Sequence, residues 1–422
     1  MVKWVSFFLL YAHLLADEGS FLTGELHNDL TYYIHRIPSS QKHIKLDLVV
    51  KVGALYEMEA EKGLSHLTEH LVTRNLRFKG VEILNDYYLI WRADSNNRVF
   101  SSYGFTQFHF DVSPTSLAPG LLMLSDIPKN IVIAADAFEE EKKEIIDEIF
   151  KEEPFKRLEQ QRFVLEYPPA LGKYLLGSAE SISHTTVDQV IGFHRKCYQP
   201  ARMAIIVVGD VNLQETKELI QNLFGGIPSP TPFRSIPRSE ASDVVIVGYQ
   251  NFGTAHLSFS QSLPKMTVKQ HFIFSMGLRY FLKSLKRVTD GTSLNNPSIE
   301  TIAFPPILRL TFNLPDSDYE KSLAILKTIF VQLIDGILTI TQEEFDQLKV
   351  EITGSLAQQS SEFFYESLVT AYRNRFLNEM SSPSPFDYEA LLNDVTLDEF
   401  KQGMLLFDGF LIDALDGTLR SL

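Results

Sequence analysis

The sequence predicts an α+β protein built from two tandem, structurally related domains, each an antiparallel β-sheet packed with helices. Segments of the first half recur in the second at offsets near 207–210 residues, which indicates duplication of one unit. A Pro-, Gly- and Ser-rich stretch at 225–243 separates the halves, and the strands lack the regular strand–helix alternation of a parallel sheet. The 422 residues therefore divide into domains at 21–224 and 244–422, joined by a linker at 225–243.

The N-terminus carries an apolar run. Lys3 precedes a stretch from Val5 to Ala16 that is interrupted only by Ser6 and His13. The run is shorter than the roughly 20 residues that span a bilayer, and it is typical of a secretory signal peptide. The alternative is a buried first element of the mature fold. We expect a signal peptide at 1–18, an exported protein and no stable membrane insertion.

The remaining elements of the first half follow from local pattern. Apolar and β-branched residues predict strands at 45–56 and 203–211, and alternating aromatic and polar residues predict a half-buried strand at 103–112. A helix is expected through GLSHLTEHLVTRNL. A second, highly charged helix is expected at 134–152, with a buried side made by Phe138, Ile145, Ile146 and Ile149.

The second half repeats these segments weakly. The corresponding pairs are 45–56 with 253–264, 137–150 with 343–356 (Phe138 in register with Phe345), 185–194 with 395–404, and 205–211 with 411–417.

Charge and cysteine content narrow the function. Lys and Arg number 39 against 53 Asp and Glu, a net charge of −14, whereas nucleic-acid binding needs a basic surface. The single cysteine, Cys197, excludes an intramolecular disulfide and a CxxC metal or redox site. A bound metal would need histidine and carboxylate ligands.

One motif has the spacing of a metal site. His66, Glu69 and His70 spell HLTEH, and residues three and four apart share a helix face. Two such imidazoles can bind one Zn²⁺, while the glutamate beside the metal can take a proton from the bound water. This is the inverted zincin motif. The alternative is two surface histidines beside a glutamate.

A catalytic zinc needs a third protein ligand. The acidic helix offers Glu141, Glu144 and Glu148, whose spacing places them near one face. A run of Glu and Lys is also typical of a solvated helix face. Spacing alone leaves the choice among the three glutamates open.

These motifs together resemble the pitrilysin/insulinase-type metallopeptidases, which include the mitochondrial processing peptidases. HLTEH followed by Glu-x6-Glu on a helix is similar to the family's metal site. The stretch KVGALYEMEAEKGLSHLTEHL, ADSN at 93–96, VFSSYGFTQF, GSAESI at 177–182 and FHRKCYQPARMAIIVVGDV at 193–211 match further family signatures. The likeness is good over 26–225 and weak beyond.

The resemblance implies a role for each site residue. His66, His70 and Glu148 would be the zinc ligands, Glu69 the general base, and Glu141 a supporting glutamate near the site. Glu144 would be a solvated residue. In the second half Glu148 corresponds to Ser355, and the HLTEH region corresponds to 273–277, so that domain would hold no metal.

The chain departs from the family pattern in three places. The helix exit reads LVTRNLRFKG, where relatives have phenylalanine and glycine sooner. Arg98 and Val99 replace an expected Asn-Ala pair on the strand that pairs with substrate. Active relatives also carry an arginine and a tyrosine that stabilise the oxyanion, whereas 284–296 retains Lys286 and Arg287 without a tyrosine.

The sequence therefore predicts an exported zinc endopeptidase that acts on extended peptides. With one pair of domains, it is expected to form a homo- or heterodimer with a similar two-domain chain. The first alternative is a catalytically weak or silent scaffold subunit of a peptidase complex, and the second is a zinc hydrolase with a non-peptide substrate.

Overall fold

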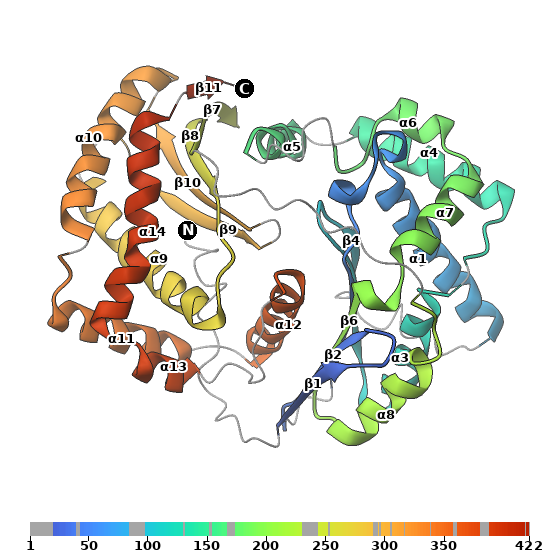
Figure 1. Cartoon of the computed structure of the whole chain (residues 1–422). Coiled ribbons are helices and arrows are strands. Elements are labelled where there is room, and N and C mark those ends of the chain that lie inside the picture. The colour runs from blue at the N-terminus through green and yellow to red at the C-terminus, as the bar shows by residue number, and fades with distance from the viewer. Residues whose placement is uncertain are drawn as a thin grey trace.

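The computed structural model has two lobes, each built on one β-sheet (Figure 1). It describes residues 20–38, 43–83, 98–129, 131–151, 154–166, 174–229, 244–251, 254–289, 294, 297–303, 306–315, 317–337, 339–357, 361–379, 388–417 and 419–421. The predicted signal peptide, ADSN at 93–96 and most of the predicted linker lie outside these residues. The domain boundaries accordingly stay a prediction, and the α+β class with two mainly antiparallel sheets is confirmed.

The first sheet has the strand order β1-β2-β6-β3-β5-β4. All neighbours pair antiparallel except β2 with β6, which are parallel. β4 lies at one end of the sheet, so one of its backbone edges has no partner strand in the described chain. The strands are β1 Phe21–Glu25, β2 Thr31–Arg36, β3 Ile44–Val50, β4 Arg98–Ser101, β5 Thr106–Val112 and β6 Met203–Gly209.

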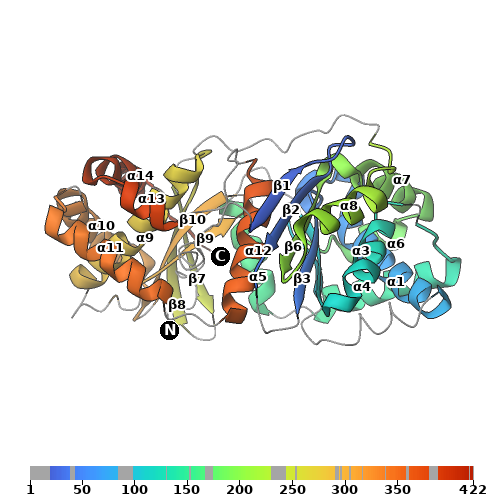
Figure 2. The same ribbon diagram turned by 90° about the horizontal axis from the view of Figure 1, so that it is seen from below.

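The helices of the first half include the two that carry the predicted site, α1 and α4. They are α1 Leu64–Ile83, α3 Leu117–Asp126, α4 Ala135–Lys151, α5 Pro154–Glu166, α6 Ala179–His184, α7 Val187–Cys197 and α8 Leu213–Phe224. Figure 2 shows α1, α3, α4, α6, α7 and α8 gathered on the outer side of the first sheet.

The second sheet has the order β11-β7-β8-β10-β9, with only β11 and β7 parallel. Its strands are β7 Val245–Asn251, β8 Thr254–Ser262, β9 Ser298–Ala303, β10 Pro306–Leu314 and β11 Leu419–Ser421. Its helices are α9 Val268–Thr289, α10 Tyr319–Ile337, α11 Gln342–Ala357, α12 Ser361–Leu377, α13 Tyr388–Asp394 and α14 Leu397–Asp416. Of the helices described, none is both long and apolar enough to cross a bilayer.

The order of elements supports the duplication. The helices α4, α5, α6 and α7 recur as α11, α12, α13 and α14. The N-cap residues of α7 and α14, Thr186 and Thr396, each form a capping box with the residue three positions on. The pairing of 205–211 with 411–417 is wrong, because 205–211 contains β6 and 411–417 lies mainly in α14. By order along the chain, the counterpart of β6 is β11.

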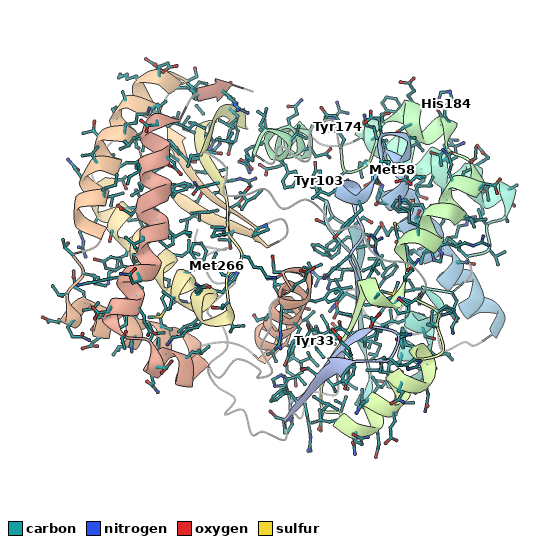
Figure 3. The ribbon with its side chains drawn as sticks, viewed as in Figure 1. Tyr33, Met58, Tyr103, Tyr174, His184 and Met266 are labelled. Carbon is teal, nitrogen blue, oxygen red and sulfur yellow. The ribbon has the colours of Figure 1, made fainter. Side chains whose placement is uncertain are left out.

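The two halves exchange one helix each. In both views α12, from the second half, lies beside the first lobe, and α5 extends toward the second (Figures 1 and 2). Tyr372 of α12 stacks on Tyr33 of β2, with ring centroids 4.9 Å apart, and Figure 3 shows Tyr33 beside this helix. Leu158 and Leu165 of α5 pack against β7 of the second sheet. Each helix therefore buries part of the sheet of the other half.

This exchange explains the run of apolar residues in β6. Successive side chains of a strand point to opposite faces. Ile205 and Val207 join the core of the first half, whereas Ile206 and Val208 join the core that extends into the second half. A strand buried on both faces reads as a continuous apolar segment rather than an alternating one.

The prediction of a half-buried strand at 103–112 is wrong, because α12 also covers the second face of this strand. β5 begins at Thr106, and all its residues are buried. Phe108 and Phe110 face the first core, while Gln107 and His109 contact α12 on the other face. There His109 contacts Asp47 at 3.0 Å and lies 3.5 Å from Glu366 of α12. The predicted strand at 45–56 is also shorter, because β3 ends at Val50 and a 3₁₀ turn follows at Ala54–Tyr56.

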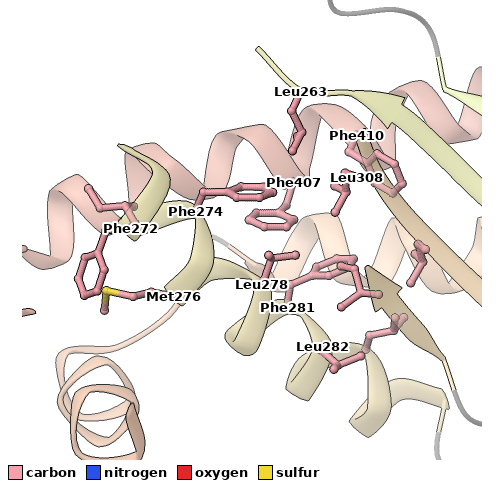
Figure 4. Close-up of a cluster of buried hydrophobic side chains, with 14 of the residues drawn as sticks. Leu263, Phe272, Phe274, Met276, Leu278, Phe281, Leu282, Leu308, Phe407 and Phe410 are labelled. Atoms are coloured by element: carbon pink, nitrogen blue, oxygen red, sulfur yellow. The ribbon is translucent and has the colours of Figure 1, made fainter. Parts of the chain in front are cut away.

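The core of the second half is rich in phenylalanine. Phe274 and Phe281 of α9 both stack on Phe407 of α14, with centroid distances of 5.1 and 5.3 Å (Figure 4). The α9 helix occupies the position that α1 has in the first half. Its residues at 273–277 are buried in this core, where α1 carries HLTEH.

Candidate metal centre

The start of α1 is held by a buried carboxylate. Both oxygens of Glu57 accept backbone hydrogen bonds, from Gly63 at 3.0 Å and Ser65 at 2.8 Å, which satisfies amide groups that a helix start leaves unpaired. Gly63 has φ +84 and packs against Gly177, which has φ +76. A side chain on Gly177 would collide with the backbone of Gly63, and one on Gly63 would collide with Ile182 and the carbonyl of Leu176, so the two glycines fix where the first turn and His66 lie.

The helix α4 faces α1 and is anchored by its own buried side. Phe138 and Ile145 are buried in the first core, with Ile146 and Ile149 packed against it, as predicted. Lys142 donates a hydrogen bond to the carbonyl of Ser183 at 2.9 Å. This packing directs Glu141 and Glu148 toward α1.

Three potential ligand atoms converge between these helices. Nε2 of His66 lies 3.8 Å from Oε2 of Glu148, and Nε2 of His70 lies 3.9 Å from the same oxygen. Zinc bonds of about 2.0–2.1 Å in a tetrahedron separate ligand atoms by roughly 3.4 Å. Both nitrogen-to-oxygen separations are close to this value, so the oxygen of Glu148 could share a zinc ion with either imidazole.

Glu69 lies beside this group in a buried position. Its Oε2 is 3.8 Å from Nε2 of His66, and its Oε1 accepts a 3.5 Å hydrogen bond from Thr73. Burial, together with the charges of Glu148 and Glu141, raises the pKa of Glu69 to about 7, although the charge of His70 opposes the shift. A carboxylate with such a pKa can both accept and release a proton near neutral pH.

The two histidines differ in protonation. Burial, and then the charge of His70, lower the pKa of His66 to about 3, so this imidazole stays neutral, as a metal ligand must be. Burial also lowers the pKa of His70, but its hydrogen bond to Glu141 and the charges of the surrounding glutamates together raise it. A metal ion would therefore displace a proton from His70 on binding.

Glu141 and Glu144 occupy different surroundings. Glu141 is buried, and its Oε2 lies 3.1 Å from Nδ1 of His70. Glu144 is exposed and lines the cavity beside the site. His66, Glu69 and His70 form one group of close potential ligand atoms, and Glu141 and Glu144 together with His70 form another. In that group, however, Glu141 contacts Nδ1 of His70, the nitrogen that points away from Glu148.

Arg74 is a site residue that the sequence analysis did not single out. It follows His70 by one helical turn and donates hydrogen bonds to Glu141 at 2.9 Å and Glu140 at 2.6 Å. Its spacing of four from His70 and eight from His66 on the HLTEH helix is the signal that could have identified it.

A further cluster of potential ligands lies under α12 and does not fit a metal. His109, Asp111 and Glu366 approach one another there. Lys45 already lies between the carboxylates, 2.7 Å from Asp111 and 3.0 Å from Glu366. The lysine ammonium thus supplies the cation at this position.

The candidate metal centre opens into a cavity of about 1200 Å³. Its walls come from α1, β4, α4 and α5, with Arg309 of β10 contributed by the second half. Along one side of the cavity, the ring of Tyr103 stacks on that of Phe163 of α5, with ring centroids 3.9 Å apart (Tyr103 is labelled in Figure 3). Carboxylates outnumber cations among the lining residues, which include Glu69, Glu140, Glu144, Asp147, Glu148 and Glu159 against Lys143, Lys151 and Arg309.

Two family models match the sequence across this region. The model described as "Insulinase (Peptidase family M16)" matches residues 35–164, and "Peptidase M16 inactive domain" matches residues 184–351. The chain belongs to the insulinase family of peptidases. The first match contains α1, α4 and all the predicted site residues, and the second includes most of the second half.

Individual relatives of this insulinase-family chain are distant. "Probable zinc protease PqqL" of Escherichia coli is 25% identical over 230 residues, which cover 52% of this chain and 24% of that protein. An "Uncharacterized zinc protease" of Rickettsia bellii is 22% identical over 371 residues, covering 83% and 86%. The match spans only 51% of a zinc protease of Rickettsia felis. The chain thus spans about a quarter of one of these relatives and about half of another.

Solved structures share the fold over more than nine-tenths of the chain. The crystal structure of the first half of the periplasmic protease PqqL from Escherichia coli superposes with a TM-score of 0.73 at 17% identity, covering 95% of this chain and 94% of that one. A protease from Helicobacter pylori gives a TM-score of 0.69 at 18% identity, covering 92% and 96%. The two-domain α+β architecture is therefore that of the insulinase family.

Proposed function

We propose that this insulinase-family chain is a zinc metalloendopeptidase, with His66, His70 and Glu148 as ligands and Glu69 as general base. The observation that supports it most is that the Nε2 atoms of His66 and His70 lie 3.8 and 3.9 Å from the same oxygen of Glu148, beside the buried Glu69. These four residues come from α1 and α4, which both pack on the core of the first half.

The chemistry divides between the metal and the protein. A zinc ion bound there would supply a Lewis acid for the peptide carbonyl and would lower the pKa of its water to about 7. Glu69, whose pKa is raised to about 7 mainly by burial, would accept a proton from the attacking water at its carboxylate and would then deliver it to the leaving amine. His66 and His70 contribute neutral imidazoles, and Glu148 contributes negative charge.

The cavity favours an extended peptide as substrate. The strand β4 is at the edge of its sheet, and Val99, Phe100 and Ser101 line the cavity. An unpaired strand edge can bind a peptide backbone by β-augmentation without demanding one sequence. The side chain of Arg98 is engaged with Glu366 at 3.3 Å. The excess of carboxylates on the walls supports a preference for basic peptides.

A second chain and an exported location complete the proposal. The full structure of the periplasmic protease PqqL from Escherichia coli superposes on 97% of this chain over only 48% of its own length. One two-domain chain therefore corresponds to half of that protein, which supports enclosure of the substrate by a similar partner chain. The apolar run before residue 18 supports export.

The experiment compares the wild-type chain with Glu69→Gln, each analysed for zinc content and for cleavage of a peptide library. We expect about one zinc per chain in both proteins, and a loss of cleavage by roughly 10²–10⁴-fold in the variant. Full cleavage by Glu69→Gln would exclude the mechanism, and a wild-type chain that binds no zinc would exclude the metal site.

A scaffold role in a heteromeric peptidase is the second candidate. Lys286 and Arg287, the residues nearest in sequence to the expected oxyanion pair, are exposed at the end of α9 and do not line the cavity. Arg309 does line it, but Glu166 and Glu300 already bind its guanidinium. Zinc binding without cleavage, both alone and with a similar chain that carries the Arg/Tyr pair, would support this candidate.

A further inference from the structure

Three residues on one face of α1 lie opposite three carboxylates of α4, so the two sets form a row of contacts between the helices. His66, His70 and Arg74 recur every four residues, so they share one helix face. The two helices run in opposite directions here, so the residue numbers of the α4 partners decrease as those of the α1 residues increase. Glu148 lies near both histidines, Glu141 lies between His70 and Arg74, and Glu140 contacts Arg74 alone.

Both oxygens of Glu141 are engaged within this series. Its Oε2 lies 3.1 Å from Nδ1 of His70, and its Oε1 accepts a 2.9 Å hydrogen bond from Nη1 of Arg74. The second guanidinium nitrogen, Nη2, donates to Glu140 at 2.6 Å. The Glu141 side chain is only 8% exposed and that of Arg74 is 25% exposed, so water competes little for the bond between them.

We infer that Arg74 is a positioning residue for the metal site, acting through Glu141 on the orientation and tautomer of His70. This inference rests on the proposed function. An ionised carboxylate only accepts hydrogen bonds, so Nδ1 of His70 carries the hydrogen in this contact. Nε2 then keeps its lone pair directed toward His66 and Glu148. Arg74 prevents the Glu141 carboxylate from rotating away, because its planar fork binds two neighbouring carboxylates at once.

If Arg74 affected zinc affinity only through its positive charge, its removal would have the opposite effect to the one that the positioning role predicts. A guanidinium near a divalent cation repels it, so removal of the positive charge would strengthen zinc binding if Arg74 acted only through its charge. A positioning role predicts weaker binding when the side chain is removed. The direction of the change in zinc affinity therefore separates the two.

The test measures the zinc dissociation constant of the full chain by competition with a chelator. We expect Arg74→Met to weaken binding by about 10–100-fold, the usual cost of removing a partner of a metal ligand. Arg74→Lys keeps the charge without the fork and should fall between Arg74→Met and the wild type. Arg195→Met, which removes an exposed arginine from α7, should bind zinc like the wild type. Unchanged or tighter binding by Arg74→Met would overturn the inference.

A double-mutant cycle tests whether the effect passes through Glu141. If it does, Arg74→Met combined with Glu141→Gln should bind zinc as Glu141→Gln alone does, whereas additive losses would contradict the inference. Melting of the metal-free variants checks the fold, and Arg74→Lys decides the matter if Arg74→Met is unstable. A wild-type chain without zinc affinity refutes the proposed function as well, but zinc binding that is equal in wild type and Arg74→Met refutes only the role of Arg74.

Discussion

His35 of β2 and Tyr372 of α12 are 337 residues apart in the chain, yet Nδ1 of His35 lies 2.8 Å from the tyrosine hydroxyl. The contact lies where a helix of the second half covers the sheet of the first. The side chain of Arg373, the next residue, donates a hydrogen bond to Gln107 of β5 at 2.7 Å. The two sheets are thus joined by side chains of an exchanged helix as well as by the connecting chain.

We expect the two halves to unfold together. Separating them would expose the sheet faces that α12 and α5 cover, including Ile206 and Tyr249. Calorimetry should show a single transition, and cleavage at a protease site inserted between residues 229 and 244 should leave the halves associated on a sizing column. Two well-separated transitions, or elution of free halves, would contradict this coupling.

The His35 contact predicts loss of stability in acid. Burial lowers the pKa of His35 to about 4, below the value of about 6.5 for an unfolded histidine. The folded state therefore binds fewer protons, so its stability is complete above pH 6.5 and declines as the pH falls toward 4. The shift corresponds to roughly 3 kcal/mol.

Urea unfolding at a series of pH values measures this effect. The variant His35→Gln should show a flatter decline of the unfolding free energy between pH 6.5 and 4 than the wild type. Tyr372→Phe removes the hydrogen bond but keeps the titrating group, so it should lower stability and retain the slope. An equal slope in His35→Gln and the wild type would show that other groups are responsible.

Glu148 and Glu144 provide a matched pair for the third ligand. Both lie on α4 and line the cavity, but only Glu148 places an oxygen within 4 Å of the Nε2 atoms of both histidines. We expect Glu148→Gln to lose most of its zinc on dialysis and Glu144→Gln to retain it. Measurement of the metal content of both variants decides between them, and the reverse result would favour the group that contains Glu144.

Glu166 at the end of α5 is predicted to be important for stability. It is fully buried and binds Arg309 of β10, together with the hydroxyl of Ser260 at 2.8 Å. Glu166→Ala would leave a buried guanidinium with less compensation, which costs about 3–5 kcal/mol. Glu300→Gln alters a partner of Arg309 that is 42% exposed and should cost less. In thermal melting, the melting temperature of Glu166→Ala should therefore be well below that of Glu300→Gln.

Part of the candidate site could be predicted from the sequence, because the grouping of His66, Glu69 and His70 follows from helix geometry. Residues three and four apart share a helix face, so HLTEH placed His66, Glu69 and His70 together before any tertiary contact was known. The acidic helix offered three glutamates with similar spacing, and only the family resemblance preferred Glu148. Arg74 was not singled out, since its importance comes from where α4 packs against α1 rather than from its neighbours in sequence.

Three features were predictable from the amino-acid sequence alone: the helix face shared by His66, Glu69 and His70, the buried strand expected at 203–211, and the duplication that relates the halves. These depend on interactions within a few residues or on repeated pattern. The three-dimensional packing was needed to show that α5 and α12 cover the sheets of the opposite halves and that β5 is buried on both faces. The polar face of β5 can be buried because α12 supplies partners for its side chains: Glu366 lies 3.5 Å from His109, and Arg373 donates a hydrogen bond to Gln107, which is 266 residues away in the sequence.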